Sequence, residues 1–331
     1  MNPEIILSVK NLHTEFHTLF GVVKAVRGVS FNVRKSETIG IVGESGCGKS
    51  VTGLSILKLI PNPPGIITQG DVLFKNENIF SMNKSRLNQI RGNFISMIFQ
   101  DPISSLNPVL TIRTQMMESI LYHTSKSHEE ALNTCVDLLN QVKIRSPKRV
   151  LSQYPHQLSG GMRQRIMIAI ALSCNPEIVI ADEPTTSLDV TVQAQIMELL
   201  REQQNKLKTA IILITHNLAV VAGMCERVLV FYAGKIVEDS PTDLLYKNPL
   251  HPYTIGLLKA IPKLNSAQED PLQTIQGSPP DLISPPPGCS FHPRCERAMN
   301  ICAISEPLLQ EIGESSVACW LYDPRCKGGI K

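Results

Sequence analysis

Apolar and polar residues alternate at the start of the chain in the way that two paired strands require. Residues 5–12 and 22–33 show this alternation, and a turn at Gly21 separates them. Farther along, helical patterns separate five short apolar runs: 38–42, 95–99, 178–181, 210–214 and 228–232. The helical patterns include residues 51–60, 163–172, 190–206 and 255–258. This order predicts an α/β fold, in which helices cover a mostly parallel sheet and the first two strands form a small antiparallel layer.

The middle and the end of the chain depart from this alternation. Residues 111–174 carry helical patterns without a convincing strand, which predicts a helical insertion. Prolines crowd the segment 261–288, so we expect a linker there, after a main domain at 1–260. Residues 289–331 then form a cysteine-rich C-terminal extension. A chain of 331 residues fits one main domain with an appendage of this size.

The octapeptide after the apolar run 38–42 has the spacing of a phosphate-binding loop. Its glycines precede a lysine and a serine, and a helical pattern follows at once. In such a loop, backbone N–H groups surround polyphosphate oxygens, and the positive end of the helix faces the same charge. We expect Lys49 to reach the β- and γ-phosphates and Ser50 to bind Mg²⁺. The predicted nucleotide-binding residues are Gly43, Glu44, Ser45, Gly46, Cys47, Gly48, Lys49, Ser50 and Val51.

Two acidic residues, Asp182 and Glu183, follow the buried run 178–181. A site that cleaves a phosphate bond needs one carboxylate for Mg²⁺ and another that positions or activates water. We therefore predict that Asp182 binds the metal and that Glu183 is the general base. By itself the pair could be an acidic end to a strand before Pro184, but the phosphate-binding loop in the same chain favours catalysis.

A second anion site is indicated by the turn Ser159-Gly160-Gly161, which precedes the helical pattern 163–172. Ser159 can cap that helix, and the two glycines expose backbone N–H groups. One ATP on the first loop does not need this turn. We therefore expect it to contact the γ-phosphate of an ATP bound to a partner subunit, with an ordinary capped helix as the alternative.

With these motifs in this order, the chain resembles the ATP-binding subunits of ABC transporters over nearly all of residues 5–260. The segments 100–108 and 154–165 and the tetrapeptide 251–254 are similar to the dipeptide, oligopeptide and nickel importer branch. The resemblance implies a P-loop NTPase fold of the ABC nucleotide-binding type. That fold has a mixed-sheet core, an antiparallel β layer and a helical subdomain.

The resemblance also assigns further residues. Phe16 falls where the family has an aromatic ring that stacks on adenine, with Phe20 as an alternative. Gln100 matches the loop glutamine that touches Mg²⁺ and water and couples to the membrane subunits. Residues 187–189 match a loop that crosses the dimer interface, and His216 matches the histidine that senses the γ-phosphate.

By the same resemblance, the chain is expected to hydrolyse ATP to ADP and phosphate and to power import of di- or oligopeptides. Its expected partners are a second ABC ATPase subunit, identical or homologous, and two membrane permease subunits, with an extracytoplasmic solute-binding protein acting indirectly. Its expected place is the cytoplasmic face of the inner membrane, as a peripheral protein. The sequence does not identify the solute, so nickel or another small solute is an alternative.

Two other classes of function are weighed against this one. A soluble ABC-type ATPase acting on DNA or ribosomes would favour a basic surface, two cassettes or a long coiled-coil insertion, and the net charge of +3 gives no argument for nucleic acid. A non-catalytic module that senses redox state or iron would not need Glu183 and His216.

Composition limits where the chain is expected to reside. Its 43% apolar and 18% charged residues are ordinary for a soluble globular protein. No apolar run approaches the roughly 20 residues that span a bilayer, and the first residues do not resemble a signal peptide. We therefore expect the chain in the cytosol.

Cysteines crowd the extension, which has too few apolar residues for a core of its own. In a reducing compartment we expect an inorganic cross-link rather than disulfides. Four thiolates suit Zn²⁺ or an iron–sulfur cluster equally, although the wide loops favour the larger cluster. The resembled ATPases carry a similar set that binds a [4Fe–4S] cluster. We therefore expect [4Fe–4S], with Zn²⁺ or free thiols as alternatives, at Cys289, Cys295, Cys302 and Cys319, and Cys326 as a spare or a replacement for Cys319.

Cys47 lies inside the phosphate-binding loop, close to a helix N-terminus that would stabilise a thiolate. One hypothesis is a reactive thiol, whose alkylation stops ATP hydrolysis. The alternative is an inert small residue.

Overall fold

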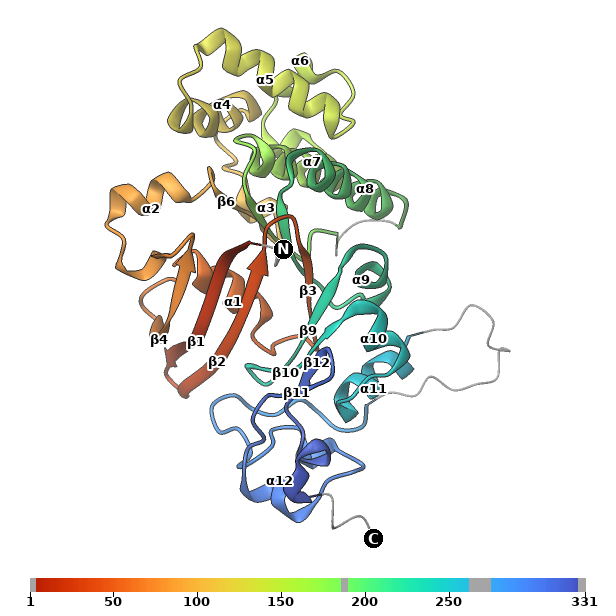
Figure 1. Cartoon of the computed structure of the whole chain (residues 1–331). Coiled ribbons are helices and arrows are strands. Elements are labelled where there is room, and N and C mark those ends of the chain that lie inside the picture. Colours follow the sequence, from red (N-terminus) through yellow and green to blue (C-terminus); the bar gives the residue numbers. More distant parts are fainter. Residues whose placement is uncertain (1–3, 186–189, 262–274, 327–331) are drawn as a thin grey trace. The chain divides into compact units, whose positions relative to one another are not determined.

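The structure is a computed structural model that describes residues 4–185, 190–261 and 275–326 (Figure 1). The segment 187–189, which the family resemblance places at a dimer interface, lies outside these ranges. The chain divides into two compact units. The first consists mainly of residues 81–213, and the second contains the described parts of 6–33, 38–80 and 214–331.

Three buried strands form the sheet of the first unit. β6 (Ile95–Ile98) pairs in parallel with β7 (Ile178–Asp182), and β8 (Ala210–Ile214) neighbours β7. All their residues are buried, as expected for the apolar runs of a sheet covered on both faces. The strands predicted at 95–99, 178–181 and 210–214 are therefore confirmed, with ends that differ by at most one residue.

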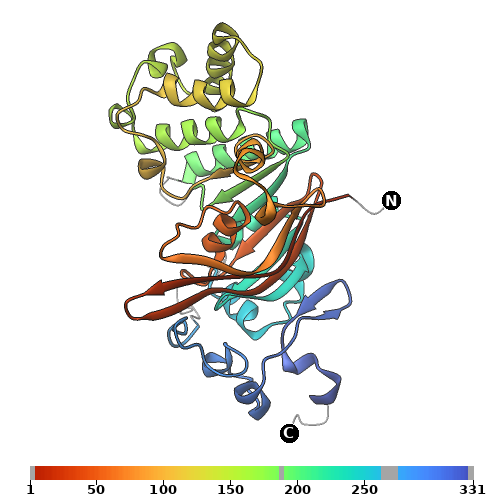
Figure 2. The ribbon, with the colours of Figure 1, turned by 90° about the vertical axis from the view of Figure 1, so that its left-hand side faces the viewer.

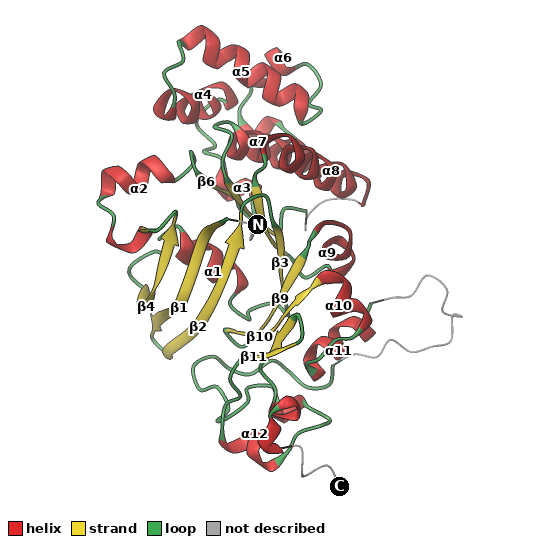
Figure 3. Cartoon of the chain, in the orientation of Figure 1, coloured by secondary structure: helices red, strands yellow, loops and turns green. Residues whose placement is uncertain are grey.

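Helices make up the rest of the first unit. α4 (Ile112–His123), α5 (His128–Gln141), α6 (Pro147–Leu151) and α7 (Gly160–Leu172) pack against one another (Figure 3). The N-terminus of α5 is closed by a capping box of Ser127 and Glu130. The other helices of this unit are α2 (Lys84–Ile90), α3 (Pro102–Ser105), the 3₁₀ turn η2 (Pro155–Gln157) and α8 (Val190–Leu207).

The second unit contains the predicted antiparallel layer. A hairpin of β1 (Ile5–Thr18) and β2 (Gly21–Arg34) confirms the first two strands, and Figure 2 shows its length. Two strands that the sequence pattern did not reveal complete the layer, in the order β2-β1-β4-β5. They are β4 (Gly65–Phe74) and β5 (Glu77–Asn78), which the 3₁₀ turn η1 (Ile79–Ser81) follows.

A second sheet in this unit has the strand order β11-β12-β10-β9-β3. β3 (Thr38–Val42) is parallel to β9 (Arg227–Tyr232), whereas β10 (Lys235–Pro241) is antiparallel to β9. The associated helices are α1 (Lys49–Ile56), α9 (Leu218–Met224), α10 (Thr242–Lys247) and α11 (Pro252–Lys259). The parallel pair brings the start of the phosphate-binding loop next to the end of β9.

The cysteine-rich extension joins this sheet and is not set apart as a distinct domain. Its strands β11 (Gln310–Ile312) and β12 (Ser315–Val317) form a hairpin, and β12 pairs with β10. The rest is mostly loop (Figure 3), with α12 (Asn300–Ile304) and the turns η3 (His292–Arg294), η4 (Trp320–Tyr322) and η5 (Pro324–Cys326). None of the helices within the described ranges is long and apolar enough to cross a bilayer.

Candidate functional site

The phosphate-binding loop runs from the end of β3 into α1, as the motif predicts. Lys49 is 5% exposed, and its ammonium donates to the carbonyl oxygens of Gly43 and Glu44, both at 2.9 Å. It also lies 3.7 Å from Cys47 Sγ. The loop therefore folds around its own lysine, and the carbonyl contacts hold the ammonium among the residues predicted to bind phosphate.

Two glycines in the loop show why the motif needs this residue type. Gly48 precedes α1 with a φ of +99°, and a Cβ there would lie 2.2 Å from the carbonyl oxygen of Ala25. Gly46 has a φ of +79°, but a Cβ there would meet no heavy atom within 4 Å among the described residues. Gly48 is thus required for close backbone packing, whereas Gly46 supplies a left-handed turn beside open space.

Cys47 does not have the environment of a reactive thiol. Its residue is 6% exposed, and burial raises the pKa of the thiol even though the Lys49 ammonium opposes the shift. The proximity of the helix N-terminus had suggested a stabilised thiolate, but burial favours the protonated thiol and is the larger effect on its pKa. Cys47 therefore fits the alternative of an inert small residue.

We expect Cys47 in the folded chain to react with N-ethylmaleimide about tenfold or more slowly than in urea, because burial limits both thiolate formation and access. Peptide mapping by mass spectrometry after timed labelling measures this rate. Cys174, which is partly exposed, serves as the control within the same chain. Labelling of Cys47 at the same rate with and without urea would contradict the inert assignment.

The two predicted catalytic acids end β7, and the structure brings Gln100 to one of them. Asp182 is 4% exposed at the end of the strand. Glu183 follows with a φ of +45°, a left-handed conformation that costs a non-glycine residue about 1–2 kcal/mol. Gln100 Nε2 donates to Glu183 Oε2 at 3.1 Å. Backbone strain of this kind, beside a carboxylate held by an amide, is typical of a functional site.

The glycine turn before α7 has the geometry expected of an anion site. Ser159 caps the helix, since its hydroxyl accepts from the Met162 N–H at 3.3 Å. Gly160 is exposed, and a Cβ there would meet no heavy atom within 4 Å in the described part of the chain. The same helix reaches the catalytic strand, because Gln164 Nε2 donates to Pro184 O at 2.6 Å. A ligand on the turn would thus sit on a helix tied to the loop that follows Glu183.

His216 is exposed immediately after β8, between two fixed neighbours. The Thr215 N–H donates to Ile41 O at 3.1 Å, and the Asn217 side chain caps α9 by accepting from the Ala219 N–H at 3.0 Å. Hydrogen bonds of these two neighbours therefore hold the backbone of His216 in place. Its role at a γ-phosphate stays a prediction.

Neither candidate for adenine stacking is decided by its surroundings. Phe16 is partly buried and lies in register with Gly65 of β4. Phe20 is 89% exposed in the β1–β2 turn. Stacking requires an accessible ring face, and the ring of Phe20 is the more accessible of the two. The adenine-stacking role of either residue stays a prediction.

Sequence reasoning missed a group of residues that supports the phosphate-binding loop from α11. The Glu44 N–H donates to Tyr253 Oη at 2.8 Å. His251 caps α11 by accepting the Tyr253 N–H on Nδ1 at 3.0 Å, and burial lowers the pKa of the imidazole to about 3. The buried Glu238 carboxylate accepts the N–H groups of Leu250 and His251. The tetrapeptide 251–254, noted above only for its family resemblance, was the available signal.

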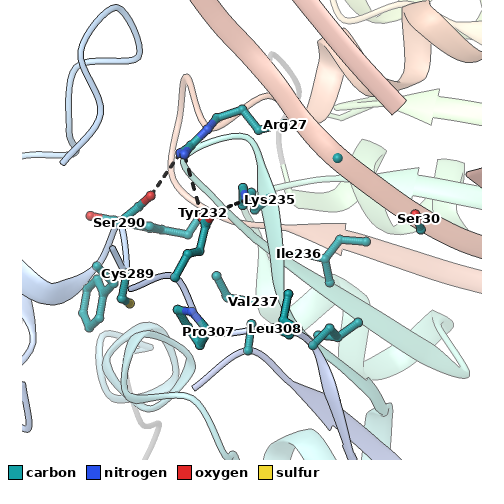
Figure 4. A pocket seen from close by; sticks show the side chains of 15 residues that line it. Arg27, Ser30, Tyr232, Lys235, Ile236, Val237, Cys289, Ser290, Pro307 and Leu308 are labelled. Carbon is teal, nitrogen blue, oxygen red and sulfur yellow. Dashed lines mark hydrogen bonds and ion pairs between the residues drawn. The ribbon is translucent and has the colours of Figure 1, made fainter. Parts of the chain in front are cut away.

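Polar contacts around Arg27 anchor the extension to the rest of the second unit (Figure 4). Arg27 Nη1 donates to Ser290 Oγ at 3.0 Å and to Ala233 O at 3.3 Å. Glu306 lies between two cations, 3.8 Å from Arg27 and 2.6 Å from Lys235. A cavity of about 230 Å³ lies here, and its walls include Arg27, Lys235, Ile236, Val237, Ser290, Glu306, Pro307 and Leu308.

The expected metal site at the four cysteines is not supported. Burial raises the pKa of the Cys319 thiol to about 12, and the nearby thiols of Cys289, Cys295 and Cys302 add smaller contributions in the same direction. No group of three or more His, Cys, Asp or Glu residues is placed to hold a metal ion within the described ranges. The expectation of a [4Fe–4S] cluster or Zn²⁺ therefore finds no support in the described residues.

Hydrogen bonds and packing hold the extension where a metal cross-link had been expected. The Cys289 N–H donates to Cys302 O at 2.8 Å, and the Met299 N–H donates to Cys302 Sγ at 3.5 Å. Cys319 packs with Leu250 and Val317 in a shared apolar core. The extension was predicted to have too few apolar residues for its own core, and it uses the core of the main domain instead.

Comparisons with known proteins agree with these features. A family model described as ABC transporter matches residues 26–186, and one described as oligopeptide/dipeptide transporter, C-terminal region, matches residues 237–302. The dipeptide transport ATP-binding protein DppD of Bacillus subtilis is 50% identical over 99% of this chain and 98% of its own length. OppD of Escherichia coli, an oligopeptide transport ATP-binding protein, is 47% identical over 92% of this chain and 90% of its own.

Solved structures show the same likeness. The ATP-binding cassette MJ0796, described as dimeric in a post-hydrolysis state with bound ADP and Pi, superposes with a TM-score of 0.65 at 27% identity. The match covers 71% of this chain and 98% of the cassette.

Proposed function

We propose a function from one premise: this chain belongs to the ABC transporter family. We infer that it binds MgATP on the loop after β3, hydrolyses it to ADP and phosphate, and thereby powers import of di- or oligopeptides. The observation that carries the proposal is the hydrogen bond from Gln100 to the strained Glu183 at the end of β7. The names of the near full-length relatives support the solute class.

In this proposal the phosphate-binding loop holds the triphosphate. Backbone N–H groups of the residues from Gly43 to Val51 surround the phosphates at the N-terminus of α1. Lys49 exchanges its carbonyl contacts within the loop for the β- and γ-phosphate oxygens. Phe16, or Phe20 as the alternative, stacks on the adenine ring.

Three oxygen donors would hold the magnesium ion: the Ser50 hydroxyl, the Asp182 carboxylate and the Gln100 amide oxygen. Hard oxygen ligands of this kind are those that Mg²⁺ prefers. When bound, Mg²⁺ neutralises charge on the β- and γ-phosphates. Asp182 is almost fully buried, so its charge requires a partner of this kind or hydrogen bonds.

Hydrolysis requires a positioned water, and the residues at the end of β7 are suited to supply it. Glu183 accepts a proton from the attacking water, while the Gln100 amide orients the carboxylate. His216 donates a hydrogen bond to the γ-phosphate and stabilises its developing charge. Glu183 acts on the attacking water, Gln100 on the Glu183 carboxylate and His216 on the γ-phosphate. Substitution of each residue should therefore affect hydrolysis in a different way.

A second ABC ATPase subunit completes each site. The exposed turn Ser159-Gly160-Gly161 supplies backbone N–H groups to an ATP held by the partner's phosphate-binding loop. Association and release of the two subunits then transmit the nucleotide state to two membrane permease subunits. The chain works as a peripheral protein on the cytoplasmic face of the inner membrane. A [4Fe–4S] cluster or Zn²⁺ forms no part of this proposal, because no group of residues in the described part of the chain is placed to hold a metal ion.

The test is reconstitution of the full chain with the membrane proteins that co-purify with it, in proteoliposomes supplied with the solute-binding protein. We expect uptake of a labelled dipeptide that requires MgATP, together with phosphate release that the dipeptide stimulates. Full-rate hydrolysis by a chain shown to be monomeric and free of membrane proteins would contradict the proposal. Nickel uptake without dipeptide uptake would overturn the solute class alone.

A further inference from the structure

We propose that Arg294, in the cysteine-rich extension, is a positioning residue for the nucleotide site. It acts through Glu44, the second residue of the phosphate-binding loop, and holds that loop in the conformation that receives the triphosphate. The inference rests on the proposed function of the loop as the ATP site. It assigns to the extension a role in nucleotide binding.

The contact between the two residues is bidentate. Arg294 Nη1 lies 2.6 Å from Glu44 Oε2, and Nη2 lies 2.9 Å from Oε1. The arginine side chain is 5% exposed and the glutamate side chain 26%. Because two parallel charge-assisted hydrogen bonds join a nearly buried guanidinium to the carboxylate, this pair fixes an orientation as well as a distance.

The guanidinium is held independently of Glu44. Arg294 Nε donates to Gln276 O at 2.9 Å, Nη1 donates to Tyr232 Oη at 3.3 Å, and the group lies over the Tyr232 ring. The backbone is held as well, since the Arg294 N–H donates to Phe291 O at 3.0 Å. The arginine is therefore a fixed anchor in the extension, and Glu44 is the partner that it positions.

Phe291 ties this anchor to the body of the second unit. Its ring packs edge-on against Tyr232, with centroids 5.2 Å apart, and lies 5.4 Å from the Tyr253 ring. Tyr253 in turn accepts the Glu44 N–H through its hydroxyl. The extension and α11 thus hold the same loop residue from two directions.

Glu44 transmits this position to the lysine that binds phosphate. Its carboxylate binds Arg294, its N–H binds Tyr253, and its carbonyl accepts from Lys49 Nζ at 2.9 Å. A displacement of the carboxylate would therefore move the carbonyl against which Lys49 rests. Without Arg294 a smaller fraction of the molecules would have the loop in the conformation that binds nucleotide. The apparent affinity for nucleotide would fall in proportion to that fraction.

The experiment measures binding of a fluorescent ATP analogue and steady-state hydrolysis in the full chain. We expect Arg294→Ala to raise both Kd and KM about tenfold, equivalent to about 1.4 kcal/mol, with kcat changed less than about twofold. Arg294→Lys should recover only part of the affinity, because lysine cannot bind a carboxylate in a bidentate manner. Arg297→Ala is the matched control, since Arg297 is exposed three residues away.

A double-mutant cycle separates positioning from general destabilisation. If Arg294 acts through Glu44, the Glu44→Ala and Arg294→Ala effects on Kd will not add, and the double variant will resemble the single ones. Thermal unfolding checks each variant, and Glu44→Gln, which keeps the side-chain size, replaces Arg294→Ala if that variant does not fold. Wild-type Kd and KM in a folded variant that lacks the pair, or additive effects, would overturn the inference.

The same assays distinguish failure of this inference from failure of the proposed function. Lys49→Ala must weaken nucleotide binding if the loop is the ATP site at all. A normal response of Lys49→Ala with no response of the Arg294 variants would overturn only the positioning role. Unchanged binding in Lys49→Ala would remove the proposed function itself.

Discussion

Replacing Glu183 with glutamine is expected to lower kcat for ATP hydrolysis by about 100-fold or more, with nucleotide affinity changed less than about twofold. Glutamine has the same shape as glutamate but cannot accept the proton of the attacking water. Its side-chain oxygen can still accept the hydrogen bond that Gln100 Nε2 donates to Glu183 in this structure. The variant should therefore keep the local geometry and lose only the base.

A second consequence follows from the role of the partner subunit. If hydrolysis releases the closed pair of subunits, a chain that binds ATP without cleaving it should accumulate as a dimer in MgATP. Phosphate release, equilibrium nucleotide binding and size-exclusion chromatography with MgATP measure the three expected effects. Glu129→Gln, an exposed change at the start of α5, is the matched control. Hydrolysis near the unmodified rate would remove Glu183 from the role of general base.

Replacing Lys49 with alanine is expected to weaken ATP binding by about 10- to 100-fold, because a hydrogen bond to a charged group contributes about 1.5–3 kcal/mol. Lys49 is 5% exposed, and its ammonium bridges the carbonyl oxygens of Gly43 and Glu44. The variant loses the cation that phosphate oxygens would contact. It also removes the ammonium that donates to two loop carbonyls, of which that of Glu44 keeps the Cys47 N–H, so some loss of thermal stability is expected.

Equilibrium titration with a fluorescent ATP analogue measures the first effect, and thermal unfolding measures the second. Lys247→Ala is the control, because Lys247 is an exposed lysine in the last turn of α10 within the same unit. Equal affinity in Lys49→Ala and in the unmodified chain would show that nucleotide binds elsewhere or not at all. Unfolded protein also lowers the measured affinity. The fall in affinity must therefore exceed the fall that the unfolded fraction explains, and both affinity and folded fraction are measured.

Local sequence patterns predicted most of the helices and strands that carry the site. They predicted fewer of the contacts that the site residues make. The sequence predicted the all-buried strands β3, β7 and β8, because a buried strand is a short apolar run. It also predicted the glycine-rich turns, because a left-handed backbone favours glycine at that position. The hydrogen bond from Gln100 to Glu183 spans 83 positions and followed from no pattern. Only the family resemblance had placed both residues at one site.

The extension shows the opposite case. Its cysteines and the family resemblance together predicted a [4Fe–4S] cluster. Cysteine spacing reports which ligands are present, but not where the folded chain places them. Its strand β12 was not predicted, since three residues are too few for a period to be visible. A reactive Cys47 was one of two hypotheses and rested on the neighbouring helix end; burial, which is a property of the tertiary structure, favours the inert alternative.

The sequence by itself determined the phosphate-binding loop, the acidic end of β7 and the capped glycine turn, because each depends on residues adjacent in the chain. Only the tertiary structure decided that Arg294 pairs with Glu44, 250 positions away in the sequence. It also decided that strand β12 of the extension pairs with β10 and that Cys319 packs against Leu250 of the main domain. The physical reason is that backbone conformation and periodic burial are encoded locally. Desolvation and the pairing of distant charges depend on the path of the whole chain.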